Sequence, residues 1–596
     1  MLFAYLVMFP VVPESTHAEG DESEDGISVI ASSDISINLL SKDEGYYKIF
    51  KDTITVSTSS ENGYTLSIAT DSADHQTLYL NGDTSSENGI YGAIGTYEQP
   101  EALGDYEWGF AVPGISYFDD IYSATEPSEE SKFAIIPLEN KIICDYTEAV
   151  TDNVTDIYYG FKLSGALELG EYETVITYTA ISADQPPTVK AVLGDNGNLN
   201  FLYNRKAYTP GETYIDNIGE TEIVEVYDDI PADTWYDVME DFGSCPAWIW
   251  SNAIYSANFD KSFYNFEPTD TACWFLGLTE LSFVTNVDNL NTDNVVDMST
   301  MFYYAGENAT TIWSIDNLSS WNTSNVADMS YMFFRAGFSA TTWDIGDLST
   351  WNTGNVTNVA EMFNSAGYKA TTFILDLGGW NTSNMTTMSG MFAGAGYSAT
   401  TWGIGDIGDW DVSNVEDMSY MFSSAGRSAP TFVLNLSDWD VGSVTSMIAM
   451  LAGAGENAST WSIGDLSGWD TCNVTSMYAM FYYAGYSAAS NWSIGNLGYV
   501  DEDHIGWDTR NVTDMFRMFE CAGYTADTWS VGDLSSWDTG NVTRMSYMFY
   551  GAGYNAAAWD IGDIHDWNVS SVSRYFHDNF VDESQSNIVD KTKLPW

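Results

Sequence analysis

The chain has 596 residues and carries 85 acidic against 19 basic residues, a formal net charge of −66. An acidic excess of this size repels nucleic acid and anionic membranes, so we exclude a nucleic-acid-binding function and expect a monomer in solution. Aromatic residues make up 15% of the chain, which excludes a wholly disordered acidic polymer. Five cysteines are too few for a disulfide scaffold, although Cys245 and Cys273 could pair.

An apolar run from Leu2 to Val12 opens the chain and is too short to span a bilayer. Residues 16–18 (Thr-His-Ala) follow and end in a small residue, as a signal-peptide cleavage site does. We therefore predict a signal peptide over residues 1–18, truncated at its start because the basic segment is missing. No other run is long enough to span a membrane, so the mature protein is expected outside the cell or on its surface.

Residues 27–183 are predicted to form an all-β sandwich of immunoglobulin-like type. Residues 54–58 and 64–68 alternate apolar and polar side chains, and residues 61–63 (Glu-Asn-Gly) between them are typical of a hairpin turn. Residues 172–179 are rich in β-branched and aromatic side chains and are predicted to be a long final strand.

Residues 188–265 are predicted to be a small mixed α/β module. A hairpin is expected around residues 195–197 (Asp-Asn-Gly). Residues 234–251 are predicted to be helical because their large apolar side chains would share one face. Those side chains are Trp235, Val238, Met239 and Phe242.

The sequence from 266 to 580 repeats nine times with a period of 29–30 residues. Most units carry a Trp, an Asn-Val-x-x-Met-x-x-Met-Phe core, an Ala-Gly pair and a second aromatic residue. One interval is longer because of an insertion at 501–503, a degenerate unit around 273–275 is expected to cap the array, and 581–596 form a tail. The Trp residues are Trp321, Trp351, Trp380, Trp410, Trp439, Trp469, Trp507, Trp537 and Trp567.

Each unit is predicted to be one rung made of a short strand and a short helix. The spacing of Val326, Met329 and Phe333 places them on one face of a helix, and the Gly of Ala-Gly would end it. Phe373 and Leu375 alternate as in a strand. The predicted fold is therefore an α+β, leucine-rich-repeat-like solenoid whose rungs stack at ~4.8 Å over ~40 Å, preceded by the sandwich.

Two polar columns also repeat. An Asn present in most units, such as Asn325, is predicted to bond the backbone of its own and the next rung. A second column alternates Asp and Asn, as at Asp347 and Asn435. Stacked carboxylates ~5 Å apart repel by about 0.8 kcal/mol per pair even in water, so they must be solvated, interrupted or metal-bound. We assign no cofactor and no metal site, but leave calcium open because it prefers hard oxygen ligands.

The two positions after Met-Phe vary from unit to unit, which a core position would not tolerate. We predict that they are exposed, and exposed Tyr, Phe and Arg are typical anchors for protein binding. Neutral drift on a solvated edge is the alternative. The candidate ligand-binding residues are Tyr303, Tyr304, Phe334, Arg335, Tyr482, Tyr483 and Tyr550.

No catalytic residue is assigned. The five His show no zinc-type spacing, and the chain has neither a Gly-x-Ser-x-Gly motif nor a phosphate-binding loop. Composition leaves a glycosidase-like acid pair open. The one aberrant unit that would carry such a pair is the short acidic insertion, which is expected to be a surface loop. We therefore expect a protein that is not an enzyme.

The sequence Trp-Asn-Thr-Ser-Asn-Val-Ala-Asp-Met-Ser-Tyr-Met-Phe, from Trp321 to Phe333, and its eight relatives resemble the repeat of the BspA-like leucine-rich-repeat surface proteins. The same repeat defines a domain of unknown function first noted in Mycoplasma lipoproteins. The resemblance covers roughly residues 260–580 and implies a bacterial cell-surface protein that adheres to an extracellular or host protein or glycan. It transfers no binding residues. A structural spacer or surface coat without a specific ligand is the alternative function.

Overall fold

The computed structural model describes most of the chain between residues 27 and 582. The predicted signal peptide at 1–18, the predicted helix up to residue 244 and the insertion at 501–503 lie outside the described residues. The described residues are 27–31, 37–39, 46–60, 62–70, 76–80, 89–94, 100–112, 127, 131–138, 141–146, 149–163, 170–173, 176–183, 187–215, 220–228, 245–498, 506–557, 559, 561–573, 578–582 and 594–595.

The chain forms two compact units, and each draws on more than one stretch of sequence. The first unit comprises Met1–Lys190, Leu202–Asp228 and Asp260–Asn265. The second unit comprises Ala191–Phe201, Asp229–Phe259 and Phe266–Trp596, and so contains all nine repeats.

The described part of the first unit is built from strands, with one short 3-10 helix, η3 (Lys261–Asn265). Its strands are β1 (Ile27–Ala31), β2 (Ile37–Leu39), β3 (Tyr46–Thr58), β4 (Tyr64–Ala69), β5 (Leu78–Leu80), β6 (Gly89–Gly92), β7 (Glu101–Ala102), β8 (Glu107–Ala111), β9 (Lys132–Phe133), β10 (Lys141–Tyr146), β11 (Val150–Leu163), β12 (Gly170–Glu173), β13 (Thr177–Ser182), β16 (Thr213–Ile215) and β17 (Glu220–Asp228).

Two sheets share one core in this unit. The large sheet has the order β1-β3-β11-β8-β6-β5-β12-β2, and the small sheet has the order β10-β4-β13. Ile54 and Val56 of β3 and Phe110 of β8 are fully buried in the same cluster as Leu66 and Ile68 of β4. Because β3 and β8 belong to one sheet and β4 to the other, these side chains pack the two sheets face to face.

The hairpin predicted around residues 61–63 is wrong as a strand pair, although both strands exist. The turn is present, since Gly63 has a φ of 77° and its N–H donates to the Ser60 carbonyl at 3.0 Å. However, β3 pairs with β1 and β11, whereas β4 pairs with β10 and β13. The turn therefore carries the chain from one sheet to the other. The long strand predicted at 172–179 is interrupted for the same reason, because β12 lies in the large sheet and β13 in the small one.

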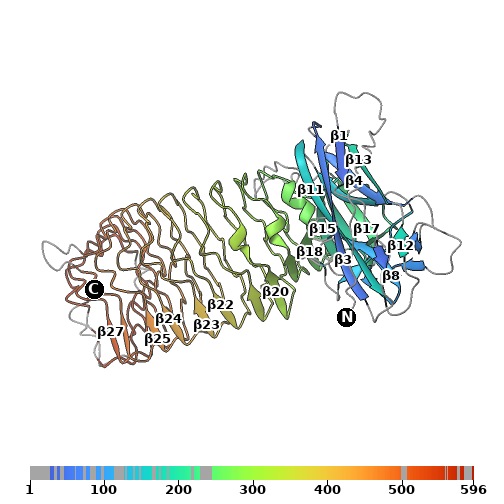
Figure 1. Ribbon diagram of the computed structural model, residues 1–596. Coiled ribbons are helices and arrows are strands. Elements are labelled where there is room, and N and C mark those ends of the chain that lie inside the picture. The colour runs from blue at the N-terminus through green and yellow to red at the C-terminus, as the bar shows by residue number, and fades with distance from the viewer. Residues whose placement is uncertain are drawn as a thin grey trace, which may run out of the picture. The chain divides into compact units, whose positions relative to one another are not determined.

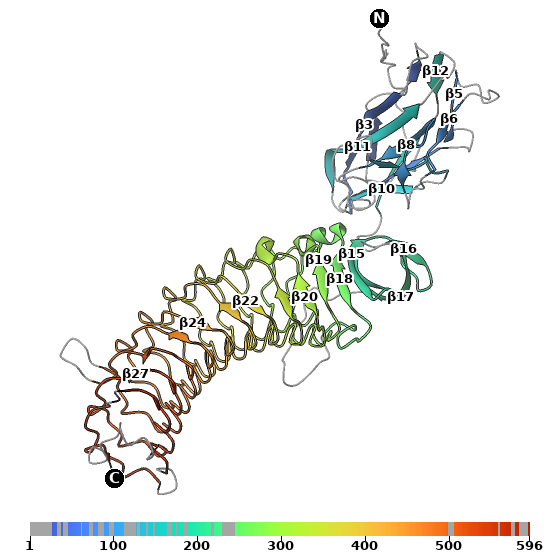
Figure 2. The same cartoon turned by 90° about the horizontal axis from the view of Figure 1, so that it is seen from below.

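The second unit is a stack of rungs that lie side by side (Figures 1 and 2). Each rung from β18 to β27 contributes one short strand. Parallel pairs join β18 to β21 in one sheet and then β22 with β23, β24 with β25, and β26 with β27, as at Trp313 with Trp343 and Phe373 with Trp402. The hairpin predicted at 195–197 is confirmed, and its second strand leads into this ladder. The strands are β14 (Thr188–Gly194), β15 (Asn198–Asn204), β18 (Ser256–Phe259), β19 (Phe283–Thr285), β20 (Ile312–Ile315), β21 (Thr342–Asp344), β22 (Thr372–Ile374), β23 (Thr401–Gly403), β24 (Thr431–Val433), β25 (Thr460–Ser462), β26 (Asn491–Ser493) and β27 (Thr528–Ser530).

The prediction of a helix in every rung, and with it the α+β leucine-rich-repeat fold, is wrong. The N–H groups of Met329, Tyr331 and Phe333 donate to carbonyls of the next rung at 2.8–3.0 Å instead of to their own turn. Tyr331 and Arg335 have φ values of 57° and 55°, which no right-handed helix allows. The segment is a chain of tight turns, and the only helices that the structure describes in this unit are the 3-10 turns η4 (Val287–Asn289) and η5 (Leu318–Ser320).

Stacked aromatic side chains fill the interior of the rungs. The Trp column is buried, with ring centroids from 6.0 Å apart at Trp537 and Trp567 to 6.4 Å apart at Trp321 and Trp351. Each indole N–H of the column donates to a carbonyl of an earlier rung, as Trp351 does to Leu318 at 3.0 Å. The degenerate unit predicted around 273–275 belongs to the stack, because Phe275 stacks on Phe302 at 4.9 Å. It does not cap the stack, because Phe259 of β18 packs on Phe275 from the preceding side.

The Asn column is confirmed as a structural ladder, but each amide bonds the preceding rung instead of the next one. The side-chain amide of Asn384 donates to the Gly354 carbonyl of the preceding rung at 2.6 Å. In a rung that lacks this Asn, the hydroxyl of Ser443 donates to the Ser413 carbonyl at 2.6 Å. The same amide bond is made by Asn325, Asn355, Asn414, Asn473, Asn511 and Asn541.

Candidate functional site

The seven candidate residues are half-buried rather than exposed, because they contact one another across rungs. They separate into two groups. Tyr303, Tyr304, Phe334 and Arg335 form part of the N-terminal aromatic cluster, and Tyr482, Tyr483 and Tyr550 form part of the C-terminal aromatic cluster. The N-terminal aromatic cluster is Trp250, Tyr303, Tyr304, Tyr331, Phe334 and Arg335, and the C-terminal aromatic cluster is Tyr478, Tyr482, Tyr483, Phe516, Arg517, Arg544, Tyr547 and Tyr550.

Rings from consecutive rungs pack closely in the N-terminal aromatic cluster. Tyr303 stacks on Phe334 with ring centroids 4.9 Å apart, and Tyr304 lies 4.7 Å from Tyr303. Tyr331, which the sequence analysis did not single out, lies 5.8 Å from Phe334. Trp250 comes from outside the repeats and lies 6.3 Å from Tyr304. This cluster therefore joins the segment before the array to its first rungs.

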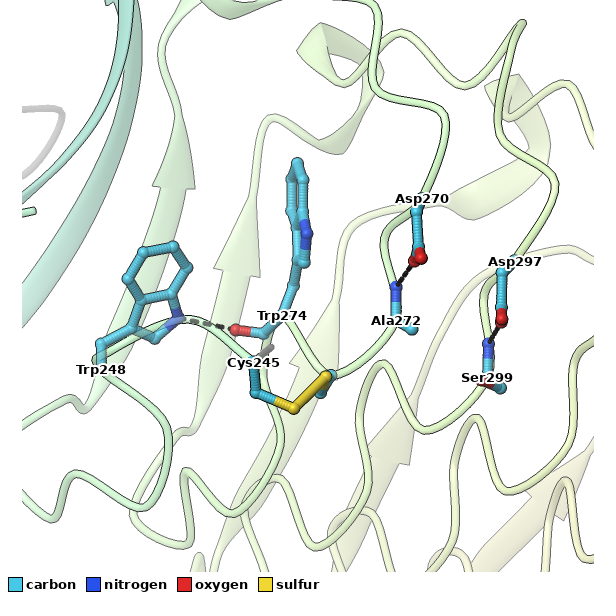
Figure 3. Close-up of a disulfide and its surroundings, with 8 residues drawn as sticks. Cys245, Trp248, Asp270, Ala272, Trp274, Asp297 and Ser299 are labelled. Atoms are coloured by element: carbon cyan, nitrogen blue, oxygen red, sulfur yellow. Dashed lines mark hydrogen bonds between the residues drawn. A yellow bond between two sulfur atoms is a disulfide. The ribbon is translucent and has the colours of Figure 1, made fainter. Parts of the chain in front are cut away.

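A disulfide holds the segment that carries Trp250. Cys245 and Cys273, which the sequence left as a possible pair, are joined, with 5.9 Å between their Cα atoms (Figure 3). The indole N–H of Trp248 donates to the Trp274 carbonyl at 2.7 Å. Trp250 is 47% exposed, so its ring is available at the surface.

Gly277 makes room for that ring. It has a φ of 69°, and a Cβ at this position would lie 2.2 Å from the Trp250 ring. Only glycine fits beside Trp250 here. Any side chain would collide with the ring, and a residue with a Cβ would be strained at this positive φ.

Arg335 is bound tightly within the first cluster. Its guanidinium lies 5.1 Å from the ring centroid of Tyr304 and 4.1 Å from that of Phe338. It also donates two hydrogen bonds to one carboxylate oxygen of Glu307 on the preceding rung, at 2.5 and 3.1 Å. The guanidinium is therefore both paired with a carboxylate and packed between two rings.

Two stacks of aromatic rings, which the sequence analysis missed, run along the same surface. Phe338, Tyr368 and Tyr397 stack at 4.6 and 4.3 Å on consecutive rungs, and Arg427 lies over Tyr397 at 5.0 Å. The position directly follows Ala-Gly in each repeat, so its recurrent Phe and Tyr were a readable signal. A second stack of this column contains Tyr486, Tyr524 and Tyr554, with 4.7 Å between successive rings.

The C-terminal aromatic cluster is built in the same way around two arginines. Tyr478 stacks on Phe516 at 5.6 Å, and Tyr482 lies 4.6 Å from Tyr483. The Arg517 guanidinium lies 5.2–5.6 Å from the rings of Tyr482, Phe516 and Tyr547. Arg544 also lies over this group, 4.7 Å from the ring centroid of Phe516 and 5.6 Å from that of Tyr478.

The basic residues of the repeats concentrate on this surface. Residues 266–580 contain seven Lys and Arg in all. Five of them lie 4.1–5.9 Å from aromatic ring centroids, an unusual concentration in a chain of net charge −66. These five are Arg335, Lys369, Arg427, Arg517 and Arg544.

Burial changes the acid–base behaviour of several groups on this surface. It raises the pKa of Glu361 and, together with the Glu361 charge, that of Tyr331. Burial also raises the pKa of the Cys521 thiol to about 11. At neutral pH this thiol is protonated and therefore a poor nucleophile.

The predicted Asp and Asn column lies elsewhere and forms turns. Asp347 is exposed, accepts a hydrogen bond from the Ser349 N–H at 2.8 Å, and its own N–H donates to Asn317 at 3.0 Å. These carboxylates are solvated, as one of the sequence alternatives required. In the part of the chain that the structure describes, no three His, Cys, Asp or Glu side chains are grouped so as to hold a metal ion.

A family model described as "Mycoplasma protein of unknown function, DUF285" matches residues 269–402, 397–502 and 491–587, together more than half of the chain. The chain belongs to this family. The three matches are tandem, which agrees with the repeated rungs. The further likeness to BspA-like leucine-rich repeats stays a prediction. No curated protein and no solved structure matches the chain. Among the described residues, no helix is long and apolar enough to cross a membrane.

Proposed function

We propose that this chain is a secreted or cell-surface binding protein, not an enzyme, and that its solenoid binds a partner protein through the two aromatic clusters and the stacks beside them. One observation supports the proposal. Half-buried Tyr, Phe and Arg side chains lie on the same turn segment of many rungs and contact one another there. Tyr, Trp and Arg are the residues that most often dominate the binding free energy of protein interfaces.

The orientation of the rings favours a protein partner over a glycan. A sugar stacks on the face of an aromatic ring, but the faces of Tyr368 are covered by Phe338 and Tyr397 at 4.6 and 4.3 Å. Such stacks offer ring edges and hydroxyl groups to a ligand. These suit the mixed apolar and polar contacts of a protein interface.

Location outside the cell is part of the proposal. It is supported by the signal-peptide-like start of the sequence and by the net charge of −66. It is also supported by the disulfide between Cys245 and Cys273, because disulfides persist in oxidising compartments.

The test is binding of the full chain to a panel of immobilised extracellular-matrix proteins and glycans. The informative variant changes Tyr303 and Tyr482 to Ser, one residue in each cluster and neither at a positive φ. The matched control is Tyr264→Ser, which alters a 57% exposed Tyr of the other unit. Saturable binding of a protein that is lost in the double variant and kept in the control is expected.

Two other results would contradict the proposal. Binding that the double variant retains would move the site off the aromatic surface. If the folded chain binds nothing in the panel, the spacer or surface-coat function is favoured instead.

A further inference from the structure

Three glutamates beside the aromatic surface pair with arginines, and a fourth, Glu361, differs from them. Glu307 pairs with Arg335 at 2.5 Å, Glu456 with Arg427 at 2.5 Å, and Glu520 with Arg517 at 3.2 Å. Glu361 forms no ion pair with any of the described residues.

Glu361 belongs to a different column of the repeat, directly before Met-Phe. It is half-buried, it follows Tyr331 in the same column on the next rung, and both have φ values near 60°. Its carboxylate accepts a hydrogen bond from the Asn364 side chain. The next residue of the column is Gly390, and a Cβ there would lie 2.4–2.6 Å from the Glu361 carboxyl atoms. The glycine therefore leaves the carboxylate room on that side.

The rings beside Glu361 have no cation of this chain over them. Tyr331 and Phe334 lie 5.8 Å apart, and within the described residues no Lys or Arg lies over either ring. Arg335, which follows Phe334 in the same rung, shows what such groups can hold, because its guanidinium contacts two other rings and a Glu at once. Glu361, Tyr331 and Phe334 are the same kinds of group, one carboxylate and two rings, and no guanidinium of the described residues lies over these two rings.

Resting on the proposed function, we propose that Glu361, Tyr331 and Phe334 receive an arginine or lysine side chain of a cationic protein partner. The carboxylate neutralises the incoming cation, and the two rings stabilise it through cation–π contacts. The net charge of −66 attracts a cationic partner at long range and repels an acidic one. Burial raises the pKa of Glu361. A bound cation beside the carboxylate would lower this pKa again.

The experiment uses the full chain and a fluorescein-labelled peptide of alternating arginine and glycine, followed by fluorescence anisotropy. The same peptide with citrulline in place of arginine has nearly the same shape without the charge. Glu361→Gln is the test variant, and Glu416→Gln is the control because Glu416 is an exposed carboxylate of another column. Tyr331→Gly removes the ring at a position where Gly390 shows that the backbone accepts glycine.

We expect Glu361→Gln and Tyr331→Gly each to weaken arginine-peptide binding about fivefold or more, and Glu416→Gln to change it less than about twofold. Citrulline peptide should bind weakly to every form. Equal effects of Glu361→Gln and Glu416→Gln would overturn the inference and leave only nonspecific attraction to an acidic protein. Equal binding of the two peptides, or no binding of either, would overturn it as well.

This inference and the proposed function can fail separately. If the panel partner is lost in the Tyr303 and Tyr482 double variant but is bound normally by Glu361→Gln, the aromatic surface is the binding site and the cation site is refuted. If no panel protein binds, but the arginine peptide distinguishes Glu361→Gln from Glu416→Gln, the cation site stands and the panel lacked the partner class.

Discussion

Arg427 and Glu456 lie on consecutive rungs, and the guanidinium donates two hydrogen bonds to the two oxygens of the carboxylate, at 2.5 and 2.6 Å. The hydrogen bonds from Arg427 to Glu456 raise the pKa of the guanidinium further above its usual range. A bidentate pair of this kind fixes the relative position of two rungs at the surface as well as neutralising two charges.

The Arg427–Glu456 pair is expected to couple energetically. A double-mutant cycle with Arg427→Met and Glu456→Gln, measured by urea denaturation, should give a coupling free energy of about 0.5–1 kcal/mol, because both side chains are only partly exposed. The Arg510–Asp508 pair, whose arginine is 68% exposed, should show no measurable coupling. The Arg510–Asp508 pair also joins two nitrogens to two carboxylate oxygens, so equal coupling in both cycles would show that burial adds nothing here.

The Asn ladder predicts different tolerance for two small changes at Asn384. Serine retains a donor for the Gly354 carbonyl, as Ser443 does in its own rung. We therefore expect Asn384→Ser to lower the free energy of unfolding only slightly. Asn384→Asp replaces the donor with a carboxylate that cannot donate and that repels the carbonyl, which should cost about 1–3 kcal/mol of unfolding free energy. Denaturant titration of both variants tests this, and similar stability of the two would refute the ladder as a source of stability.

The contribution of Asp297 to the free energy of unfolding should decrease as pH rises. Burial, with a smaller effect from Asp328, raises the folded-state pKa of Asp297 above its unfolded value. The folded state therefore holds this proton more tightly, and the stability that it adds at low pH is lost as pH rises from about 4 through the folded pKa. Asn at this position can still accept the Ser299 N–H bond, so Asp297→Asn should raise Tm at pH 7 and leave it unchanged near pH 3.

Asp347 provides the matched comparison for that experiment. The hydrogen bond from the Ser349 N–H lowers its pKa, so Asp347 contributes stability that is present above the unfolded pKa and is lost as pH falls. Asp347→Asn should therefore fail to raise Tm at pH 7. A rise in Tm at pH 7 for both variants would indicate general relief of acidic repulsion rather than an effect of burial.

The repeat period, the buried Trp column and the Asn ladder could be predicted from the sequence, because each depends on residue type at fixed spacing. The secondary structure between them could not. Val326, Met329 and Phe333 point inward in a helix and in a chain of tight turns alike, so their spacing does not separate the two. The positive φ of 57° at Tyr331 excludes a helix, and nothing about a tyrosine in the sequence predicts a positive φ. Gly390 in the same column was the available hint.

The candidate site was found in part. Variation after Met-Phe correctly placed Tyr303 and Tyr482 outside the buried core, but the prediction that they are exposed is wrong. Variation at single positions does not show that such side chains pack against other rings and become half-buried. Trp250 was missed because it lies outside the repeats and reaches the cluster through a fold-dependent contact. Glu361 differs from Glu307, Glu456 and Glu520 in forming no ion pair with a described residue, and sequence alone does not show which side chains pair.

Trp469 and Trp507 are 38 positions apart in the sequence, yet their rings stack at 6.1 Å and 4°, as closely aligned as Trp537 and Trp567, which are 30 positions apart. Eight extra residues therefore enter between two rungs without shifting the register of the column. Because the indole of each Trp in the column bonds the rung before it, a rung is positioned by its neighbour rather than by the length of chain between them. The family can in this way vary its reach and its surface without redesigning its interior.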